Sequence, residues 1–322
     1  PLNNGIVDKL SEEKITVFGP DKASSQLESS KIFMKNICKK LNVPTAKYSI
    51  FDNEKKALNF LDTIDFPTVI KADGLAAGKG VVIAKNKNEA VETIKNIMSK
   101  RIFGTSGENI IIEEFLEGEE ISFFALVDTN GFILPLTTAQ DHKKIGEGDT
   151  GLNTGGMGAY SPVPFIKQNQ INDFVIKFVK PVIKDLKHNN IFFSGIFYAG
   201  LILTKYGPKL LEINVRFGDP EAQAVLPRLK TDLLDLLLAS SKGRLDQLRS
   251  PEWDNNFCIN VVMASKGYPE SYKKNTIISG LNKITVNKSQ YIFHSSTKKN
   301  EDQWLATGGR VLSISALGST LK

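Results

Sequence analysis

The sequence predicts an α+β fold made of more than one module, and three observations support this prediction. Two short apolar strand patterns, at residues 68–71 and 80–84, flank a glycine-rich loop. An amphipathic helical pattern follows at residues 89–100, which completes a small α+β module. Strand-rich stretches at residues 120–136 and 193–215, with a helical pattern at 171–186 between them, imply a larger core of sheet and helices.

Weaker patterns define the remaining elements. Residues 15–19 have a short strand pattern closed by Gly-Pro, and residues 24–41 have helical spacing after it, as at the end of an α/β unit. The other expected elements are a strand at 109–114, a helix at 232–240 and two late strands at 258–264 and 310–316.

The bulk composition narrows the class of protein. The chain has 322 residues, 41% of them hydrophobic and 24% charged, which is ordinary for a globular protein with a sizeable core. The net charge is +6, yet the lysines are scattered and form no basic block. We therefore expect anionic small molecules such as nucleotides as partners, and no nucleic acid.

The cysteines and the apolar runs exclude disulfide-rich proteins, CxxC metal proteins and membrane-spanning proteins. Cys38 and Cys258 are the only cysteines, so a disulfide framework and a CxxC metal cluster are both excluded. A reducing, cytoplasmic setting is the default expectation. No apolar run reaches the roughly 18 residues of a membrane span, so we expect no membrane partner.

The first chemically informative stretch is the glycine-rich loop between Lys71 and Gly80. Its glycines would let backbone N–H groups approach phosphate oxygens, and two lysines would supply positive charge. The spacing fits neither the Walker A pattern nor the dinucleotide fingerprint. A plain glycine-rich hairpin turn remains the alternative explanation.

Two later stretches carry polar groups on strands. The acidic stretch 111–120 ends a strand, where a hinge could offer backbone groups to an adenine and an acid to a ribose; a solvated loop is the alternative. Glu212, Asn214 and Arg216 recur with a period of two, so a single strand face would carry all of them. Carboxylate and amide oxygens suit Mg²⁺ held jointly with phosphates, and arginine can stabilise charge on a transferring phosphoryl group.

Several motifs in one order resemble the ATP-grasp superfamily: Ser30-Lys31, the 71–80 loop, the 113–120 stretch and the Glu212–Asn214 pair. Within it, three stretches are similar to signatures of the phosphoribosylamine–glycine ligase family. These are Asp-His-Lys at 141–143, Asn-Thr-Gly-Gly-Met-Gly-Ala-Tyr-Ser-Pro at 153–162, and Asn-Val-Arg-Phe-Gly-Asp-Pro-Glu at 214–221. The resemblance extends over essentially the whole chain.

The resemblance implies an ATP-grasp fold, in which two α+β modules clasp ATP, and a ligase reaction. ATP would phosphorylate the carboxylate of glycine, and phosphoribosylamine would attack the acyl phosphate to give glycinamide ribonucleotide, ADP and phosphate. The implied cofactors are ATP and Mg²⁺ or Mn²⁺, and the implied state is a monomer. The alternatives are another ATP-grasp carboxylate–amine ligase and a nucleotide-binding fragment without turnover.

The same resemblance assigns candidate site residues. The nucleotide would contact Lys31, Lys71, Gly74, Gly78, Lys79, Gly80, Glu113, Phe115, Leu116 and Glu120. The metal would be held by Glu212 and Asn214. The acceptor and glycine pocket would be lined by Asp141, Gly155, Gly156, Met157, Gly158, Arg216 and Asp219, with Arg216, Asp219 and Lys71 as the catalytic groups.

The resemblance also suggests domain limits. Residues 1–20 would be the remnant of an N-terminal α/β domain, because the glycine-rich opening segment of the family is absent and no initiator Met is present. Residues 21–47 and 119–250 would form the ATP-grasp core, residues 48–118 its lid module, and residues 251–322 a partial C-terminal domain.

Overall fold

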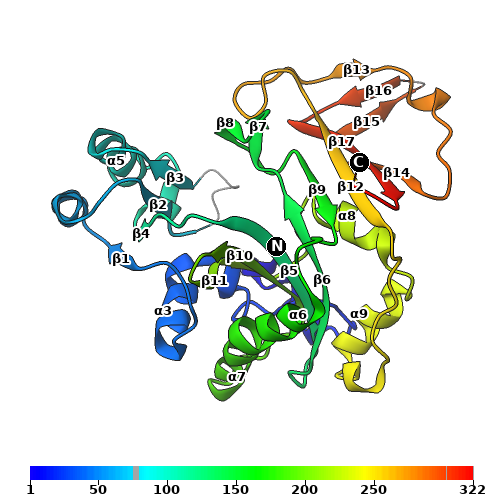
Figure 1. Ribbon diagram of the computed structural model, residues 1–322, viewed down its shortest axis with the longest axis horizontal. Helices are drawn as coiled ribbons and strands as arrows, with labels where there is room; N and C mark the ends of the chain where they lie inside the picture. The colour runs from blue at the N-terminus through cyan, green and yellow to red at the C-terminus, as the bar shows by residue number, and fades with distance from the viewer. Residues whose placement is uncertain (75–79, 302, 322) are drawn as a thin grey trace. The chain divides into compact units, whose positions relative to one another are not determined.

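The structure is a computed structural model that describes residues 1–74, 80–301 and 303–321. The chain divides into two compact units, each described here by itself (Figure 1). Unit 1 comprises Pro1–Leu136, Gln168–Arg216 and Leu234–Arg249, and unit 2 comprises Thr137–Lys167, Phe217–Leu233 and Ser250–Lys322. The predicted lid module lies entirely within unit 1 and the predicted C-terminal domain within unit 2, while the domain limits themselves stay predictions.

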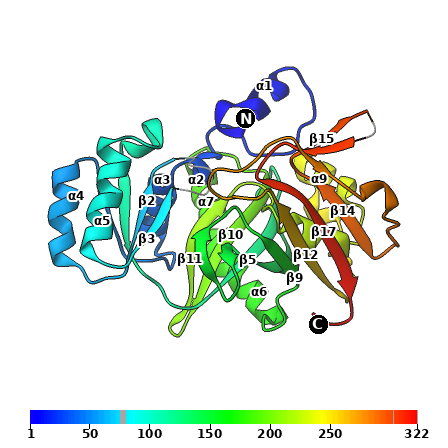
Figure 2. The ribbon, with the colours of Figure 1, turned by 90° about the horizontal axis from the view of Figure 1, so that it is seen from above.

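A small antiparallel sheet in unit 1 has the strand order β1-β4-β2-β3. It places residues 71 and 113 on neighbouring strands, because residue 71 of β2 is paired with Ile111 of β4. Helices α4 and α5 lie together on one face of the sheet (Figure 2). The elements are β1 (Tyr48–Phe51), α4 (Glu54–Phe60), β2 (Thr68–Ala72), β3 (Val81–Ala84), α5 (Lys87–Ile94) and β4 (Ile110–Glu114).

The core of this module is formed by apolar side chains from both layers. Ile70 and Ile112 of the sheet and Ala90 and Ile94 of α5 are all almost completely buried. Burial of aliphatic side chains contributes roughly 1.5–3 kcal/mol each, which fixes the sheet against its helices. The module is therefore a stable platform for the loop between β2 and β3.

The larger sheet of unit 1 has the strand order β11-β10-β5-β6 and carries the second group of predicted site residues. Its apolar face is covered by the helical segment 168–188, with Phe123 packed 5.7 Å from Phe174 between ring centroids. The elements are β5 (Glu119–Val127), β6 (Ile133–Asp141), α6 (Gln168–Phe174), a π-helical turn (Val175–Val179), α7 (Lys180–His188), β10 (Gly195–Thr204) and β11 (Gly207–Asn214).

Further helices complete unit 1. Helix α3 contacts both α7 and β11, which places its buried face next to the edge of the larger sheet. Helix α9 begins at the last residue of a unit 2 segment and continues in unit 1. These helices are α1 (Ile6–Glu12), α2 (Gln26–Ser29), α3 (Lys31–Leu41) and α9 (Leu233–Ser241).

Unit 2 contains the second half of β6. The strands of its sheet lie in the order β6-β9-β12-β17-β14. Helix α8 packs against β9, β12 and β17. Smaller sheets join β7 with β8, and β13 with β16 and β15. The elements are β7 (Lys144–Gly146), β8 (Thr150–Asn153), β9 (Gly158–Ser161), α8 (Ala222–Val225), β12 (Phe257–Ala264), β13 (Thr276–Ile278), β14 (Gln290–His294), β15 (Thr297–Asn300), β16 (Gln303–Ala306) and β17 (Arg310–Gly318).

The prediction of an α+β fold is confirmed, and two local predictions are wrong. Residues 15–19 form no strand, because they pair with no other strand in the described part of the chain. The expected single helix at 24–41 is broken at Ser30, which has extended backbone angles and caps α3 by accepting a hydrogen bond from the Phe33 N–H at 3.0 Å. Serine competes for backbone donors in this way and so favours helix starts over helix interiors.

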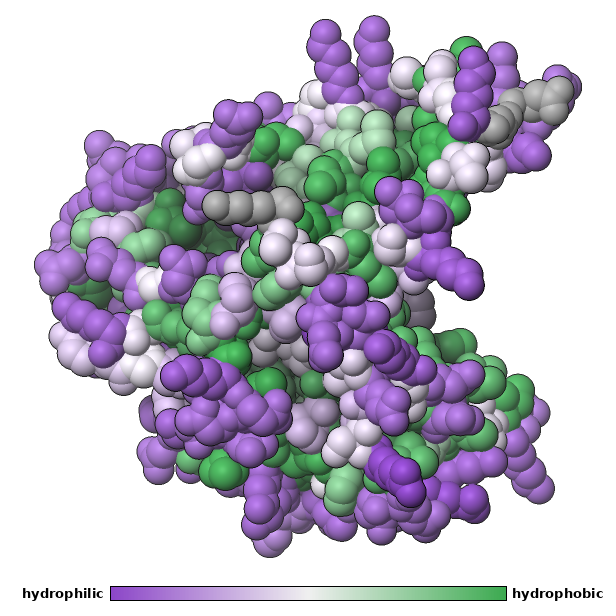
Figure 3. Space-filling model, turned by 45° about the vertical axis from the view of Figure 1, so that its right-hand side comes forward, coloured by the Kyte–Doolittle hydropathy of each residue, from purple (hydrophilic) through white to green (hydrophobic). Residues whose placement is uncertain are grey.

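Within the described ranges, no helix combines the length and the apolar character needed to cross a bilayer. Hydrophilic side chains are distributed over the face of the molecule seen in Figure 3.

Candidate active site

Three charged side chains, Lys71, Glu113 and Lys35, form a buried chain in unit 1 that begins at β2, the strand before the glycine-rich loop. Lys71 Nζ on β2 lies 3.1 Å from Glu113 Oε2 on β4. Glu113 Oε1 lies 3.2 Å from the Nζ of Lys35, a fully buried residue of α3. The strand register makes Lys71 and Glu113 diagonal neighbours, which brings their side chains within reach of each other. The carboxylate therefore bridges two ammonium groups.

Lys31 stands at the start of the same helix and faces the loop. Its Nζ donates a hydrogen bond to the Gly74 carbonyl oxygen at 3.0 Å, and the Ile32 N–H donates to Asp73 Oδ1 at 3.1 Å. Burial lowers the pKa of Lys31, which the charge of Glu212 opposes and the charge of Lys71 reinforces. The Lys31 ammonium group is therefore held against the first residues of the glycine-rich loop.

Only the two ends of the glycine-rich loop are among the described residues. Gly74 and Gly80 lie at its two ends, and the Gly80 carbonyl oxygen accepts a hydrogen bond from the Ala72 N–H at 2.8 Å. Gly78 and Lys79, which were predicted to contact phosphates, lie outside the described residues. Their assignment stays a prediction.

The predicted metal ligands lie together at the end of β11. Asn214 Nδ2 donates a hydrogen bond to Glu212 Oε1 at 3.2 Å, so both side chains share one strand face as the period-two spacing predicted. Gly200 is paired with Glu212 on the neighbouring strand, and a Cβ at Gly200 would come within 2.9 Å of Glu212 Cγ. The glycine therefore leaves the space that the Glu212 side chain fills.

Arg216 lies beyond the end of β11 but its guanidinium still reaches this face. Its Nη2 lies 3.5 Å from Asn214 Oδ1 and forms an ion pair of 2.9 Å with Glu28 Oε1. The Val215 N–H also donates to the Glu28 carboxylate. Glu28 of α2 therefore fixes the position of the arginine beside the predicted metal ligands.

The predicted hinge follows β4. Phe115 is 37% exposed, Leu116 is half-buried and Glu120 is exposed on β5, so these residues can reach a bound ligand. The Glu113 side chain points instead into the buried charge chain, and its carbonyl oxygen accepts from Thr68 Oγ1 at 2.8 Å. The Glu113 carboxylate is therefore occupied by the two lysines, and the contact of Glu113 with the adenine stays a prediction.

The predicted acceptor residues of unit 2 gather around a tightly held turn. The Met157 N–H donates to the His142 carbonyl oxygen, and the Met157 carbonyl oxygen accepts from the Val262 N–H at 2.9 Å. Gly156 has a φ of +106°, and a Cβ there would meet Pro220 Cδ at 2.3 Å, so a glycine is required. Asp141 and Gly158 lie on the adjoining strands β6 and β9.

Asp219 is tied to that turn by Arg310, a residue from β17. Arg310 Nη1 donates to the Gly155 carbonyl oxygen at 2.7 Å and to the Asp219 carbonyl oxygen at 2.6 Å. The Tyr268 hydroxyl oxygen accepts from the Gly155 N–H at 2.9 Å. Gln223 Nε2 donates to Asp219 Oδ1 at 2.9 Å. Unit 2 therefore brings the glycine turn and Asp219 together.

The predicted residues accordingly form two groups. Unit 1 contains the described nucleotide residues and the metal residues together with Arg216, and unit 2 contains the remaining acceptor residues. The groups in each unit converge from segments that are far apart in the sequence.

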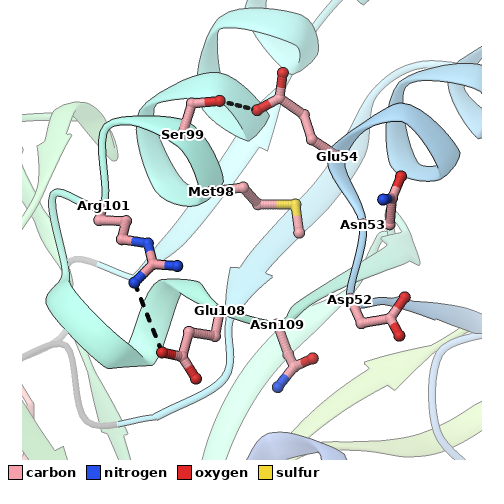
Figure 4. A pocket seen from close by; sticks show the side chains of 8 residues that line it. All are labelled: Asp52, Asn53, Glu54, Met98, Ser99, Arg101, Glu108 and Asn109. Carbon is pink, nitrogen blue, oxygen red and sulfur yellow. Dashed lines mark hydrogen bonds and ion pairs between the residues drawn. The ribbon is translucent and has the colours of Figure 1, made fainter.

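A pocket of about 480 Å³ elsewhere in unit 1 is distinct from these groups (Figure 4). In this pocket the Ser99 hydroxyl donates a hydrogen bond to the Glu54 carboxylate, and Arg101 Nη1 lies 3.8 Å from Glu108 Oε1. Its carboxylates would repel the phosphates of a nucleotide. The pocket is lined by Asp52, Asn53, Glu54, Met98, Ser99, Arg101, Glu108 and Asn109.

The chain matches the models of a known protein family. The model of the phosphoribosylglycinamide synthetase ATP-grasp (A) domain matches residues 29–222, and that of the C domain matches residues 258–322. A phosphoribosylamine–glycine ligase from Caldanaerobacter subterraneus is 45% identical over 322 residues, which cover all of this chain and 76% of the relative. The chain belongs to the phosphoribosylglycinamide synthetase family.

Three further comparisons relate this family member to known sequences and structures. The chloroplastic phosphoribosylamine–glycine ligase of Arabidopsis thaliana is 46% identical over 327 residues, covering all of this chain and 61% of the plant protein. The crystal structure of the Thermotoga maritima phosphoribosylamine–glycine ligase is 32% identical, with a TM-score of 0.83 over 95% of this chain and 75% of that one. A biotin carboxylase from Campylobacter jejuni is 13% identical with a TM-score of 0.77 over 98% of this chain and 68% of that one, which shows a shared ATP-grasp fold.

The structure also places beside the predicted site residues three side chains or glycines that the sequence analysis did not name: Lys35, Gly200 and Arg310. Lys35 could have been found, because it is a charged residue among the apolar, buried positions Met34, Ile37 and Cys38 of α3. Arg310 and Gly200 gave no such signal. Their importance depends on which distant residues the fold places beside them.

Proposed function

We propose that this chain joins glycine to 5-phosphoribosylamine with ATP, and that it takes part in purine biosynthesis. A carboxylate oxygen of glycine attacks the γ-phosphorus of ATP, and ADP leaves. The amine of phosphoribosylamine then attacks the carbonyl carbon of glycyl phosphate, loses a proton and expels phosphate. Positioning and charge stabilisation provide most of the rate enhancement in such phosphoryl transfers.

The observation that carries the proposal is the position of two lysines in unit 1. Lys31 Nζ donates to the Gly74 carbonyl oxygen of the loop, and Lys71 Nζ lies 3.4 Å from the Leu211 carbonyl oxygen, next to Glu212 on β11. Two ammonium groups suit the phosphates of a nucleotide, and the carboxylate suits its metal. In this proposal Gly74 and Gly80, with Gly78 and Lys79, cover the phosphates, while Phe115, Leu116 and Glu120 hold the nucleoside.

The donor set at the end of β11 fits Mg²⁺. One carboxylate and one amide oxygen are hard ligands, and Mg²⁺ is usually held by one or two carboxylates together with substrate phosphates. Glu212 and Asn214 would hold the metal, and Mn²⁺ suits the same oxygen ligands. When bound, the metal would neutralise charge on the phosphates during transfer.

Unit 2 would supply the pocket for glycine and the amine. The Gly155–Gly158 turn, Asp141 and Asp219 would line this pocket, where the two carboxylates suit a substrate that carries an ammonium or amine group. Arg216 would stabilise the negative charge on the transferring phosphoryl group. These roles are proposals for individual residues of this chain.

We further propose that the protein acts as a cytoplasmic monomer on small molecules alone. The scattered lysines argue against a nucleic-acid partner, because nucleic-acid binding needs a concentrated basic surface.

The test is a coupled assay for ADP with ATP, Mg²⁺, glycine and freshly prepared phosphoribosylamine, in which each substrate is omitted in turn. ADP formation should need glycine and be accompanied by glycinamide ribonucleotide. Equal ADP formation when bicarbonate or another amino acid replaces glycine would contradict the proposed substrate.

A further inference from the structure

Lys35 is a buried charged residue with no place among the predicted substrate contacts. Its side chain is 0% exposed, so it cannot touch a bound nucleotide. Its Nζ donates to Thr45 Oγ1 at 2.7 Å, lies 3.2 Å from Glu113 Oε1, and stands 5.3 Å from the centre of the Tyr48 ring. Burying a lysine costs free energy unless the charge is paired, so this arrangement needs an explanation.

The charges of the buried chain do not cancel. Lys35 and Lys71 share the single carboxylate of Glu113, and all three side chains are at least nine-tenths buried. Two positive charges and one negative charge leave an excess of one positive charge. Without Lys35, Glu113 would pair with Lys71 alone and the excess would be zero. Lys35 therefore determines how much positive charge Lys71 can offer to an anion.

The same residues connect the small sheet to the strand of the predicted metal ligands. Lys71 Nζ also lies 3.4 Å from the Leu211 carbonyl oxygen, next to Glu212 on β11. Thr45 Oγ1 donates to the Leu210 carbonyl oxygen at 2.6 Å, and Thr45 is the residue that receives the Lys35 hydrogen bond. Lys35 and Lys71 are thus both anchored to β11, so the charge of the pair is fixed relative to that strand.

We propose that Lys35 is a positioning residue for nucleotide binding: it holds one oxygen of Glu113, so that the carboxylate orients Lys71 without neutralising it. The inference rests on the proposed nucleotide site and goes beyond it, because it assigns a role to a residue that touches no substrate. The charge of Lys35 affects the binding of the phosphate groups of the nucleotide. The binding of the nucleoside part does not depend on it.

The experiment compares the affinities of ADP and adenosine for the wild type, Lys35→Met and the double variant Lys35→Met/Glu113→Gln by calorimetry. Methionine is unbranched and only one heavy atom shorter than lysine, so it keeps most of the packing and removes the charge. Lys35→Met should weaken ADP binding about tenfold, as for the loss of one charge-assisted interaction, and change adenosine binding less than twofold. In the double variant, Lys71 is no longer neutralised and glutamine still accepts its hydrogen bond, so ADP affinity should return to within about threefold of the wild type. Lys39→Met, at an exposed position one turn later on α3, is the matched control and should bind ADP normally.

The outcomes separate this inference from a merely structural role. Equal weakening of ADP and adenosine by Lys35→Met, or no weakening of ADP, would overturn it. If Lys35→Met does not fold, the double variant decides: a folded double variant with near-normal ADP affinity supports the inference, and one that binds ADP tenfold more weakly overturns it. A wild-type protein that binds ADP no better than adenosine would overturn the proposed nucleotide site itself.

Discussion

Arg310 holds Asp219 at two points, with Nη1 2.6 Å from the main-chain carbonyl oxygen and Nη2 3.3 Å from Oδ2 of the carboxylate. The same Nη1 donates to the Gly155 carbonyl oxygen. One guanidinium from β17 thus connects two motifs that the chain separates widely. Lysine could not reproduce these contacts, because its single ammonium group lacks the planar fork of donors.

Replacing Arg310 by methionine should therefore loosen the turn and Asp219 together. We expect kcat/KM for glycine or phosphoribosylamine to fall by about ten- to a hundredfold, the scale for a misplaced binding group, while ADP affinity changes less than twofold. Steady-state kinetics and calorimetry measure the two effects. Lys298→Met, at an exposed position of β15 in the same unit, serves as the control. An equal loss of ADP affinity would mean that Arg310 does not act through the acceptor pocket.

Lys71→Ala should weaken nucleotide binding by about 1.5–3 kcal/mol, because it removes a charge-assisted contact with phosphate. Calorimetry with ATP measures this change in the folded variant. Lys85→Ala is a suitable comparison, since Lys85 is exposed and directly follows β3 of the same sheet. Unchanged ATP affinity in the Lys71 variant would remove this lysine from the site.

Glu212→Ala should abolish turnover that depends on Mg²⁺ and leave the fold intact, because Glu212 supplies the carboxylate of the proposed metal site. Measuring activity against Mg²⁺ concentration tests the loss of turnover, and circular dichroism tests whether the fold is intact. Glu92→Ala, on the exposed face of α5, removes a carboxylate from the same unit and should behave as the wild type. A normal Mg²⁺ dependence in Glu212→Ala would place the metal elsewhere.

The buried thiol of Cys38 should make the free energy of unfolding depend on pH. Burial raises the pKa of Cys38 from 9.0 to about 12, against the opposing charge of Lys35. The folded state therefore keeps a proton that the unfolded state loses, so the stabilisation is complete below pH 9 and declines as the pH rises towards 12. Between pH 9 and 11, wild-type protein should lose on the order of 2 kcal/mol more stability than Cys38→Ala. Urea unfolding at both pH values measures this difference, and parallel losses in the two proteins would contradict the raised pKa.

The sequence predicted elements and motifs better than it predicted which side chains would meet. Period-two spacing correctly placed Glu212 and Asn214 on one face, because a strand has only two faces. It missed the helix break at Ser30, where a local side-chain hydrogen bond outweighs helical periodicity. It also missed the contact of Arg310 with Gly155 and the ion pair of Lys35 with Glu113, because tertiary packing joins residues that lie more than 75 positions apart in the sequence.

The most direct test of the central claim is the product formed from ATP, Mg²⁺, glycine and phosphoribosylamine. We expect one glycinamide ribonucleotide for each ADP released, with no ADP release above background when glycine is omitted. Chromatography of the reaction with isotopically labelled glycine measures both quantities at once. ADP release without incorporation of labelled glycine into a ribonucleotide would contradict the assignment of this chain as a glycine-activating ligase.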